Sequence, residues 1–321
     1  MTSSIDDNVH ATYGDYKERS MGVKYSLVHL TEISCPPPKM IHVAAKAGYD
    51  FVSLRTIPMG LTGEKPYDIA KDRTLLKEIR QAVEETGIVI NDTENAKIFD
   101  GVTISNYEPC LEAAAELGIR HVLTNIWTDD KSFYTEKFCE LCELAAQYDQ
   151  TISVEFVTWA SVKDMKTVKE LLLASSCTNA GVVVDTLHFY RSRVDLDEFA
   201  SLPREWFHFA HLCDAGMEIP VDQEALIHTG REERLYPGEG FIDIKSIIEK
   251  IPHVVRGLEI PHRVRVNELG YEEHARHALK RTREYMGDSY TIVSRNLDGC
   301  TAPLGARTLK SKYYPRNACE Q

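Results

Sequence analysis

The chain has 321 residues, of which 43% are hydrophobic, so it is long enough to bury one large core. Its formal net charge of −12 at pH 7 disfavours nucleic acids and anionic membrane surfaces as partners, and no run of about 18 apolar residues predicts a membrane span. The start of the chain lacks the basic and apolar parts of a secretory signal. We therefore expect a cytoplasmic protein that acts on small molecules.

Strand-like and helix-like segments alternate along the chain. The first residues, 1–22, are polar and without periodicity, and they predict a flexible extension. The strand-like runs that follow are residues 24–30, 50–54, 89–93, 121–126, 152–156, 181–185, 206–212 and 254–259. The helical patterns are residues 37–47, 72–86, 108–117, 131–148, 162–174, 196–202, 244–251 and 272–286.

This alternation predicts an α/β fold with parallel strands inside and helices outside, and eight repeats fit closure into a (β/α)8 TIM barrel. An open, doubly wound sheet would alternate in the same way. However, the first strand runs into His29-Leu30-Thr31-Glu32 instead of a glycine-rich dinucleotide turn. We predict a single barrel domain over residues 23–287, followed by an irregular tail over residues 288–321.

One predicted connection, residues 213–241 between the seventh strand and its helix, is unusually long. It contains Arg231, Arg234 and the turn Pro237-Gly238-Glu239-Gly240. Loops of this length in compact domains are commonly lids or binding segments. We expect this connection to cover the active site.

Four residues with metal-binding side chains stand at the C-terminal tips of predicted strands five to eight. They are Glu155, Asp185, His211 and Glu259. One such carboxylate could be a helix cap or an ion-pair partner, but adjacent barrel strands bring all four side chains to one place. Three carboxylates and one imidazole suit Mn²⁺, Mg²⁺ or Co²⁺, and we expect Mn²⁺ first.

Several segments together resemble the xylose isomerase-like barrels, which include sugar phosphate isomerases and epimerases, ketose 3-epimerases and inosose isomerase-type enzymes. The segments are Glu155, Asp185-Thr186-Leu187-His188, His211 with Asp214, residues 234–240 and Glu259. The resemblance extends from about Val23 to Met286. It implies that Glu155, Asp185, His211 and Glu259 bind a divalent metal. It also implies that His188 and an arginine of residues 213–241, Arg231 or Arg234, hold substrate oxygens.

A divalent ion chelated by a substrate carbonyl and the neighbouring hydroxyl would stabilise the ene-diolate that forms when the carbon between them loses a proton. Glu155 and Glu259 come from opposite sides of the four-residue arc, so we expect them to act as the acid–base pair. Return of the proton to the opposite face would epimerise the carbon. Return to the adjacent carbon would interchange aldose and ketose, and loss of a β-substituent would make a lyase.

Two more charged residues end predicted strands near the barrel mouth. Arg55 closes the second strand and offers a forked donor to substrate oxygens, whereas Glu94 follows the third strand and either contacts substrate or pairs with Arg55. His188 lies beyond a strand tip, where it either faces the pocket or begins a helix.

The sequence thus favours a metal-dependent isomerase or epimerase of a carbonyl sugar, cyclic polyol or glycoside. We find no glycine-rich phosphate turn, and Glu155-Phe156-Val157-Thr158-Trp159 indicates a rather apolar pocket, which suits a cyclic polyol or a glycoside. A lyase or dehydratase, of the dehydroshikimate dehydratase-like or 3-oxo-glycoside-cleaving kind, would begin with the same proton abstraction. A non-catalytic sugar-binding subunit is a further alternative.

A DNA-repair enzyme of the endonuclease IV type is disfavoured by the acidic charge and by Arg55 and Glu94 at strands where that group has histidine ligands. A homo-oligomer formed through the outer helices or the tail stays open.

Overall fold

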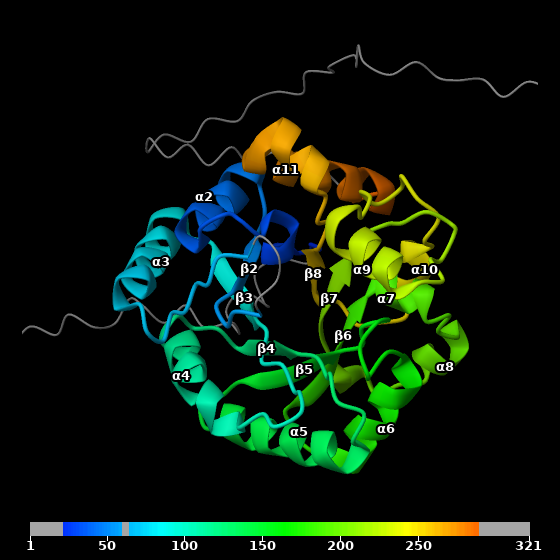
Figure 1. Cartoon of the computed structure of the whole chain (residues 1–321). Coiled ribbons are helices and arrows are strands. Elements are labelled where there is room, and N and C mark those ends of the chain that lie inside the picture. The colour runs from blue at the N-terminus through cyan, green and yellow to red at the C-terminus, as the bar shows by residue number, and fades with distance from the viewer. Residues whose placement is uncertain (1–21, 60–63, 289–321) are drawn as a thin grey trace, which may run out of the picture. The chain divides into compact units, whose positions relative to one another are not determined.

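The computed structural model describes residues 22–59 and 64–288, so nearly all of the predicted extension and tail lies outside the described residues. Eight parallel strands close into a barrel in sequential order, and the helices form a ring around it (Figure 1). This confirms the predicted (β/α)8 architecture. The strands are β1 (Tyr25–Val28), β2 (Phe51–Arg55), β3 (Val89–Glu94), β4 (His121–Thr124), β5 (Thr151–Glu155), β6 (Ala180–Asp185), β7 (Phe207–Leu212) and β8 (Val255–Leu258).

The helices of the ring begin with repeated capping chemistry. Aspartates 72, 130, 164 and 243 each accept hydrogen bonds from backbone N–H groups in the first turn of the helix that follows. The helices are α2 (Pro37–Ala47), α3 (Arg73–Thr86), α4 (Glu108–Glu116), α5 (Lys131–Ala146), α6 (Met165–Ser175), α7 (Thr186–Arg191), α8 (Leu196–Ala200), α9 (Gln223–Glu232), α10 (Ile244–Ile248) and α11 (Arg263–Met286), with 3-10 turns η1 (His29–Glu32), η2 (Ile104–Tyr107) and η3 (Arg204–Trp206).

Three differences from the expected elements have physical causes. Residues 213–241 were expected to be a loop, but they contain α9, whose only buried residue is Gly230, so it has no apolar stripe that could predict it. The short helix α7 was not expected and depends on Asp185 as its N-cap. Helix α11 begins at Arg263 instead of residue 272, because its first part is mostly polar and is separated from the rest by a kink at Gly270.

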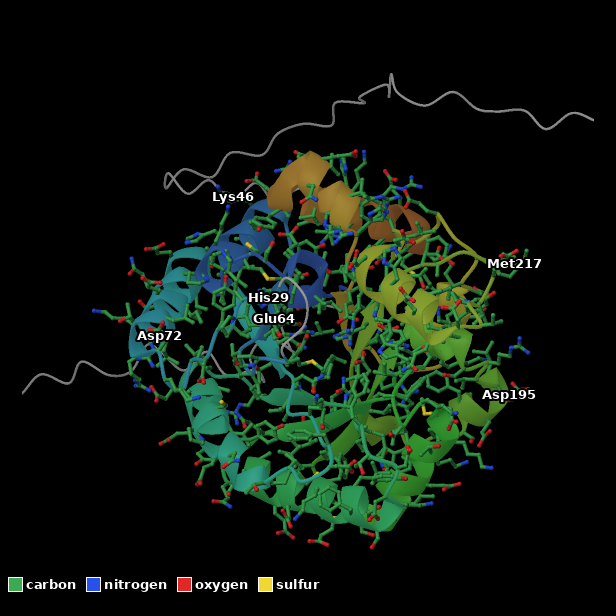
Figure 2. The ribbon with its side chains drawn as sticks, in the orientation of Figure 1. His29, Lys46, Glu64, Asp72, Asp195 and Met217 are labelled. Carbon is green, nitrogen blue, oxygen red and sulfur yellow. The ribbon has the colours of Figure 1, made fainter. Side chains whose placement is uncertain are left out.

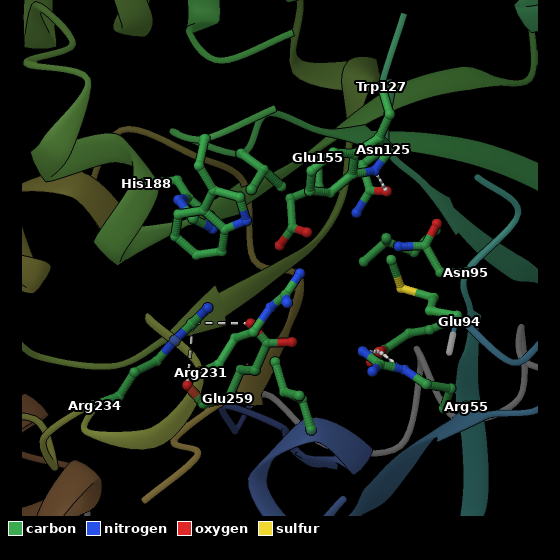
Figure 3. A pocket seen from close by; sticks show the side chains of 15 residues that line it. Arg55, Glu94, Asn95, Asn125, Trp127, Glu155, His188, Arg231, Arg234 and Glu259 are labelled. Carbon is green, nitrogen blue, oxygen red and sulfur yellow. Dashed lines mark hydrogen bonds and ion pairs between the residues drawn. The ribbon is translucent and has the colours of Figure 1, made fainter. Parts of the chain in front are cut away.

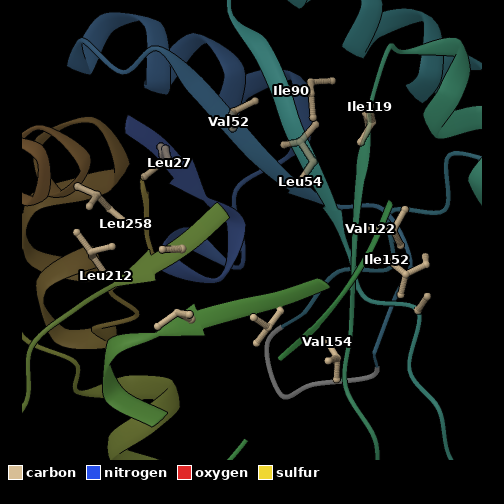
Figure 4. Close-up of a cluster of buried hydrophobic side chains, with 14 of the residues drawn as sticks. Leu27, Val52, Leu54, Ile90, Ile119, Val122, Ile152, Val154, Leu212 and Leu258 are labelled. Carbon is tan, nitrogen blue, oxygen red and sulfur yellow. The ribbon is translucent and has the colours of Figure 1, made fainter. Parts of the chain in front are cut away.

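The two faces of the strands make two apolar layers. Residues such as Leu27, Val52, Val154 and Leu258 pack outward between the strands and the helices (Figure 4). A smaller cluster plugs the barrel interior with Phe51, Leu123, Val183, Phe209 and Val255. Because side chains on a strand alternate faces, the residue two positions further on also points inward. This places Asp185 above Val183 and His211 above Phe209, at the C-terminal end of the barrel.

Polar side chains cover the outside of the ring. Lys46 on α2 and the N-cap residues Asp72 and Asp195 lie on the outside of the ring, whereas His29 and Glu64 lie close to the barrel mouth (Figure 2). Among the described helices, none combines the length and the apolar character needed to cross a membrane.

Candidate active site

The four predicted metal ligands meet at the C-terminal end of the barrel. Glu155 and Asp185 are the last residues of β5 and β6, His211 lies in β7, and Glu259 directly follows β8. One ligand atom from each of these buried residues lies within 4.8 Å of all the others. Gly257 on β8 leaves room for this packing, since a Cβ at that position would stand 2.9 Å from Cδ2 of His211.

His211 lies at the centre of the cluster. Its Nδ1 is 3.6 Å from Oε1 of Glu155 and 3.6 Å from Oε1 of Glu259. Among the described residues, both ring nitrogens of His211 and Oε1 of Glu155 lack a hydrogen-bond partner. Unpartnered polar atoms are rare in a protein interior, and Nδ1 of His211 faces Oε1 of Glu155 across a short gap. The donor set therefore fits a divalent cation.

Arg234 binds two of the candidate ligands. Its Nη1 lies 2.6 Å from Oδ2 of Asp185 and 2.9 Å from Oε2 of Glu259, and its Nε donates to the carbonyl oxygen of Gly230. The guanidinium is buried and engaged by protein atoms on these sides. A contact of Arg234 with substrate stays a prediction, whereas its contact with the two carboxylates is shown.

The two predicted acid–base carboxyls have different electrostatic surroundings. Burial, together with the charge of Glu259, raises the pKa of Glu155 to about 7. Burial also acts on Glu259, but Arg234 and then His211 outweigh it and hold the pKa of Glu259 below its ordinary value. Neighbouring carboxyls whose pKa values are pushed apart are a common arrangement for acid and base catalysis.

Arg55 and Glu94 form a buried ion pair at the barrel mouth. Nη2 of Arg55 lies 2.6 Å from Oε2 of Glu94, and Nε of Arg55 donates to the same oxygen at 3.2 Å. Nη1 of Arg55 and Oε1 of Glu94 have no hydrogen-bond partner among the described residues. Both residues also line the pocket above the metal-ligand cluster, so pairing and substrate contact are compatible.

His188 both begins a helix and faces the pocket. It lies in α7, where its backbone N–H donates to Oδ1 of Asp185. Its Nδ1 accepts from the backbone N–H of Thr158 at 3.3 Å, which leaves the ring proton on Nε2. Burial lowers the pKa of His188 to about 4, so the ring is neutral at pH 7. The ring also packs edge-on against Trp159 at 4.9 Å.

These side chains enclose a small pocket of about 40 Å³ (Figure 3). Its wall includes the predicted residues Arg55, Glu94, Glu155, His188, Arg231, Arg234 and Glu259. Asp185 and His211 are fully buried and do not line it. The structure thus brings all nine predicted site residues to one end of the barrel.

Asp92 was missed in the sequence. One ligand atom of Asp92 lies within 4.8 Å of those of Glu94 and His211. Oδ1 of Asp92 accepts from Ser53 and Asn91, but Oδ2 has no partner among the described residues. The available signal was its position two residues before Glu94 on the same strand, which puts both side chains on the inner face.

The glycine-containing turn after α9 is a structural clamp. Oδ2 of Asp214 accepts from the N–H groups of Gly238 and Gly240, and Oδ1 accepts from Ile242. Asp214 also forms an isolated bridge with Leu235, the residue next to Arg234. The turn thereby fixes the segment that carries Arg234 into the site.

Solved structures with the same fold include three informative ones. A crystal structure of the IolI protein with a bound zinc atom has a TM-score of 0.70 and 18% identity, over 82% of this chain and 98% of that one. The 3-keto-D-glucoside 4-epimerase YcjR from E. coli gives 0.62 and 14%, over 82% and 99%. The probable 3-DHS dehydratase AsbF from Bacillus anthracis gives 0.63 and 16%, over 83% and 100%.

At these identities the likeness establishes the fold alone. A search of curated proteins finds no match. The family itself is shown by sequence, because residues 41–285 match the family described as xylose isomerase-like TIM barrel. The barrel, the strand-end cluster and this match agree, and the chain belongs to the xylose isomerase-like TIM barrel family.

Proposed function

We propose that the protein is a divalent-metal-dependent isomerase or epimerase that moves a proton next to the carbonyl group of a sugar, cyclic polyol or glycoside. The observation that carries this proposal is the buried cluster of Glu155, Asp185, His211 and Glu259, which has unpartnered atoms facing its centre. The structure of an epimerase with the same fold supports the reaction class.

The four residues of this cluster would hold the cation, which when bound polarises a carbonyl and stabilises the charge left by proton removal. Mn²⁺ is our first choice for this oxygen-rich set, and Zn²⁺ deserves a direct comparison because the IolI structure contains zinc. The native ion is part of the proposal.

The protein's own residues divide the remaining work. Glu155, with a pKa of about 7, is suited to take up and release the proton, and Glu259, held ionised by Arg234, is the base on the other side. Nε2–H of His188 and Nη1 of Arg55 are donors for substrate oxygens, since each lies on a pocket residue. Trp127 and Trp159 give the pocket apolar walls.

A lyase is the second candidate. Elimination starts with the same proton removal, and a probable dehydratase shares the fold. The alternative of a sugar-binding subunit predicts no chemistry at all, although the complete set of candidate ligands supports an enzyme.

Deuterium exchange tests these alternatives directly. The Mn²⁺-loaded protein is incubated in D₂O with ketoses, inososes, 3-oxo-glycosides and dehydroshikimate, quenched with EDTA and examined by proton NMR. Metal-dependent deuterium incorporation with an isomeric product is the expected result. Loss of water or of an aglycone would identify a lyase, and no exchange with any compound would remove the catalytic proposal.

A further inference from the structure

Arg231 is a half-buried cation between two cavities. It lies on α9 and lines both the pocket of about 40 Å³ above the metal-ligand cluster and a neighbouring cavity of about 310 Å³. Within residues 22–59 and 64–288, we find no hydrogen bond or ion pair of its guanidinium. Its one ring contact is with Trp159, whose centroid lies 5.8 Å from Cζ. Figure 3 shows the Arg231 side chain extending over the pocket.

The other arginines beside these cavities have acidic partners. Arg55 pairs with Glu94, Arg234 pairs with Asp185 and Glu259, and Arg263 pairs with Glu232 at 3.0 Å. Glu64, the acidic group that acts on Arg231, accepts from the backbone N–H of Met59 and lies 3.8 Å from Arg55.

The missing counter-charge has a cost. Removing a cation from water without an acidic partner is unfavourable. Burial, followed by repulsion from Arg55 and Arg234, lowers the pKa of Arg231. The described residues therefore place no anion in direct contact with the Arg231 guanidinium.

The sizes of the two cavities indicate where such an anion would come from. Ligand sites commonly enclose roughly 300–1,000 Å³, so the inner pocket has space for only the reacting part of a substrate. The larger cavity lies between η1, α9 and the start of α11, and it shares Leu30 and Arg231 with the inner pocket. The two cavities therefore adjoin at Arg231 and Leu30.

We propose that the substrate carries an anionic group that Arg231 binds at the boundary of the two cavities. The carbonyl end then lies in the inner pocket, and the anionic end lies in the larger cavity. A carboxylate is favoured over a phosphate ester because its two oxygens match the fork of a single guanidinium and the chain has no glycine-rich phosphate turn. The placement of the carbonyl end rests on the proposed function, whereas the anion site does not.

Three ketohexoses that differ at one carbon make a matched test. Binding of D-fructose, D-fructuronate and D-fructose 6-phosphate is measured by isothermal titration with the Mg²⁺-loaded full-length protein. The wild type is compared with Arg231→Gln, Arg231→Lys and the control Arg265→Gln. Arg265 lies on α11 but lines neither cavity, and it is already paired with Glu239 at 2.7 Å.

We expect the wild type and R265Q to bind the acid at least about tenfold more tightly than fructose, since a charged hydrogen bond contributes about that much. R231Q should abolish this preference, and R231K should keep part of it. A stronger preference for the phosphate would support the anion site in its phosphate form. Equal binding of all three sugars, no binding of either anion, or equal weakening of neutral and acidic sugars by R231Q would overturn the proposal.

The two experiments can contradict the proposed reaction and the proposed anion site independently of each other. Preference for the anion without deuterium exchange would remove the isomerase and keep the anion site. Exchange into neutral sugars without any preference would do the reverse.

Discussion

Two buried histidine–glutamate sites in this barrel have contacts of the same length but different charge states; the site of His211 is called the first contact and the site of His274 the second contact. His211 lies 3.6 Å from Glu155 and from Glu259, and His274 lies 3.6 Å from Glu32. Burial by itself would lower the pKa of His211. The Glu259 and Glu155 carboxylates outweigh this effect, so the pKa of His211 is raised well above its ordinary value. Burial lowers the pKa of His274 to about 3 and raises that of Glu32 to about 9, so both are neutral at pH 7.

The difference follows from the number of charges around each histidine. His211 faces two carboxylates and has Asp185 within the same cluster, with Arg234 behind them. His274 has one carboxyl near it, that of Glu32. The ring nitrogens of His274 and the carboxyl oxygens of Glu32 have no hydrogen-bond partner among the described residues. The separation of two side chains therefore does not identify a cation site. Convergence of four candidate ligands is what supports the metal site proposed at His211.

The largest expected effect on activity comes from neutralising Glu259, a carboxylate of the first contact. Glu259→Gln should lower kcat/KM by about a thousandfold, or about 4 kcal/mol, because the base and one candidate metal ligand are lost together. His274→Gln, in the second contact, should keep activity within a few-fold. Steady-state kinetics on the substrate found by deuterium exchange measure both. Near-normal turnover of the Glu259 variant would remove its catalytic role.

Added Mn²⁺ should stabilise the protein against unfolding through the first contact and not through the second. At a free Mn²⁺ concentration of about 100 times Kd, the wild type should gain about 2.7 kcal/mol of unfolding free energy. Glu155→Gln should lose most of this gain, and it should disturb the metal-free fold little because glutamine keeps the size of the side chain and Oε1 of Glu155 accepts no hydrogen bond from a described residue. His274→Gln should keep the gain. Thermal unfolding with and without Mn²⁺ measures it, and equal shifts in all three proteins would contradict a site at Glu155.

The sequence predicts the residues of the first contact because each of them is marked by a local pattern. Glu155 and Asp185 each end a run of apolar strand residues, and such runs are visible without knowledge of the tertiary fold. Eight such runs with helices between them leave few topologies, and in a barrel the strand ends converge.

What the sequence did not predict depends on contacts between distant segments. Arg234 could be assigned to the mouth, but its bonds to Asp185 and Glu259 join residues 49 and 25 positions away. Asp92 lies inside a predicted strand, and it comes close to His211 only when the barrel closes. The Glu32–His274 contact joins the first turn to the last helix, and no local pattern marks it.

The second contact should show itself in the pH dependence of stability. Glu32 stays protonated in the native state up to a pH of about 9, whereas in the unfolded chain it ionises near its ordinary value of 4.5. The unfolded state binds fewer protons between these values, so stability falls as pH rises. From pH 7 to 8.5 the loss is about 2 kcal/mol.

Glu32→Gln should remove this loss, because an amide has no proton to release. Urea unfolding of the wild type and the variant at the two pH values measures the difference, and the exposed Glu268→Gln on α11 serves as control. A variant that loses as much stability as the wild type would show that Glu32 is ionised in the native protein.

The smallest expected effect concerns Asp92, which borders His211 in the first contact. Its unpartnered Oδ2 is suited to accept from Nε2–H of His211, and this contact would orient the ring so that Nδ1 faces Glu155 and Glu259. Asp92→Asn keeps the size of the side chain but removes its charge, so the affinity for Mn²⁺ should fall by about tenfold. Titration with Mn²⁺ measures the affinity, and ¹⁵N NMR of the Mg²⁺-loaded protein reports which ring nitrogen of His211 keeps its proton. A tautomer and an affinity that both stay unchanged would mean that the carboxylates facing Nδ1 are sufficient to orient the ring.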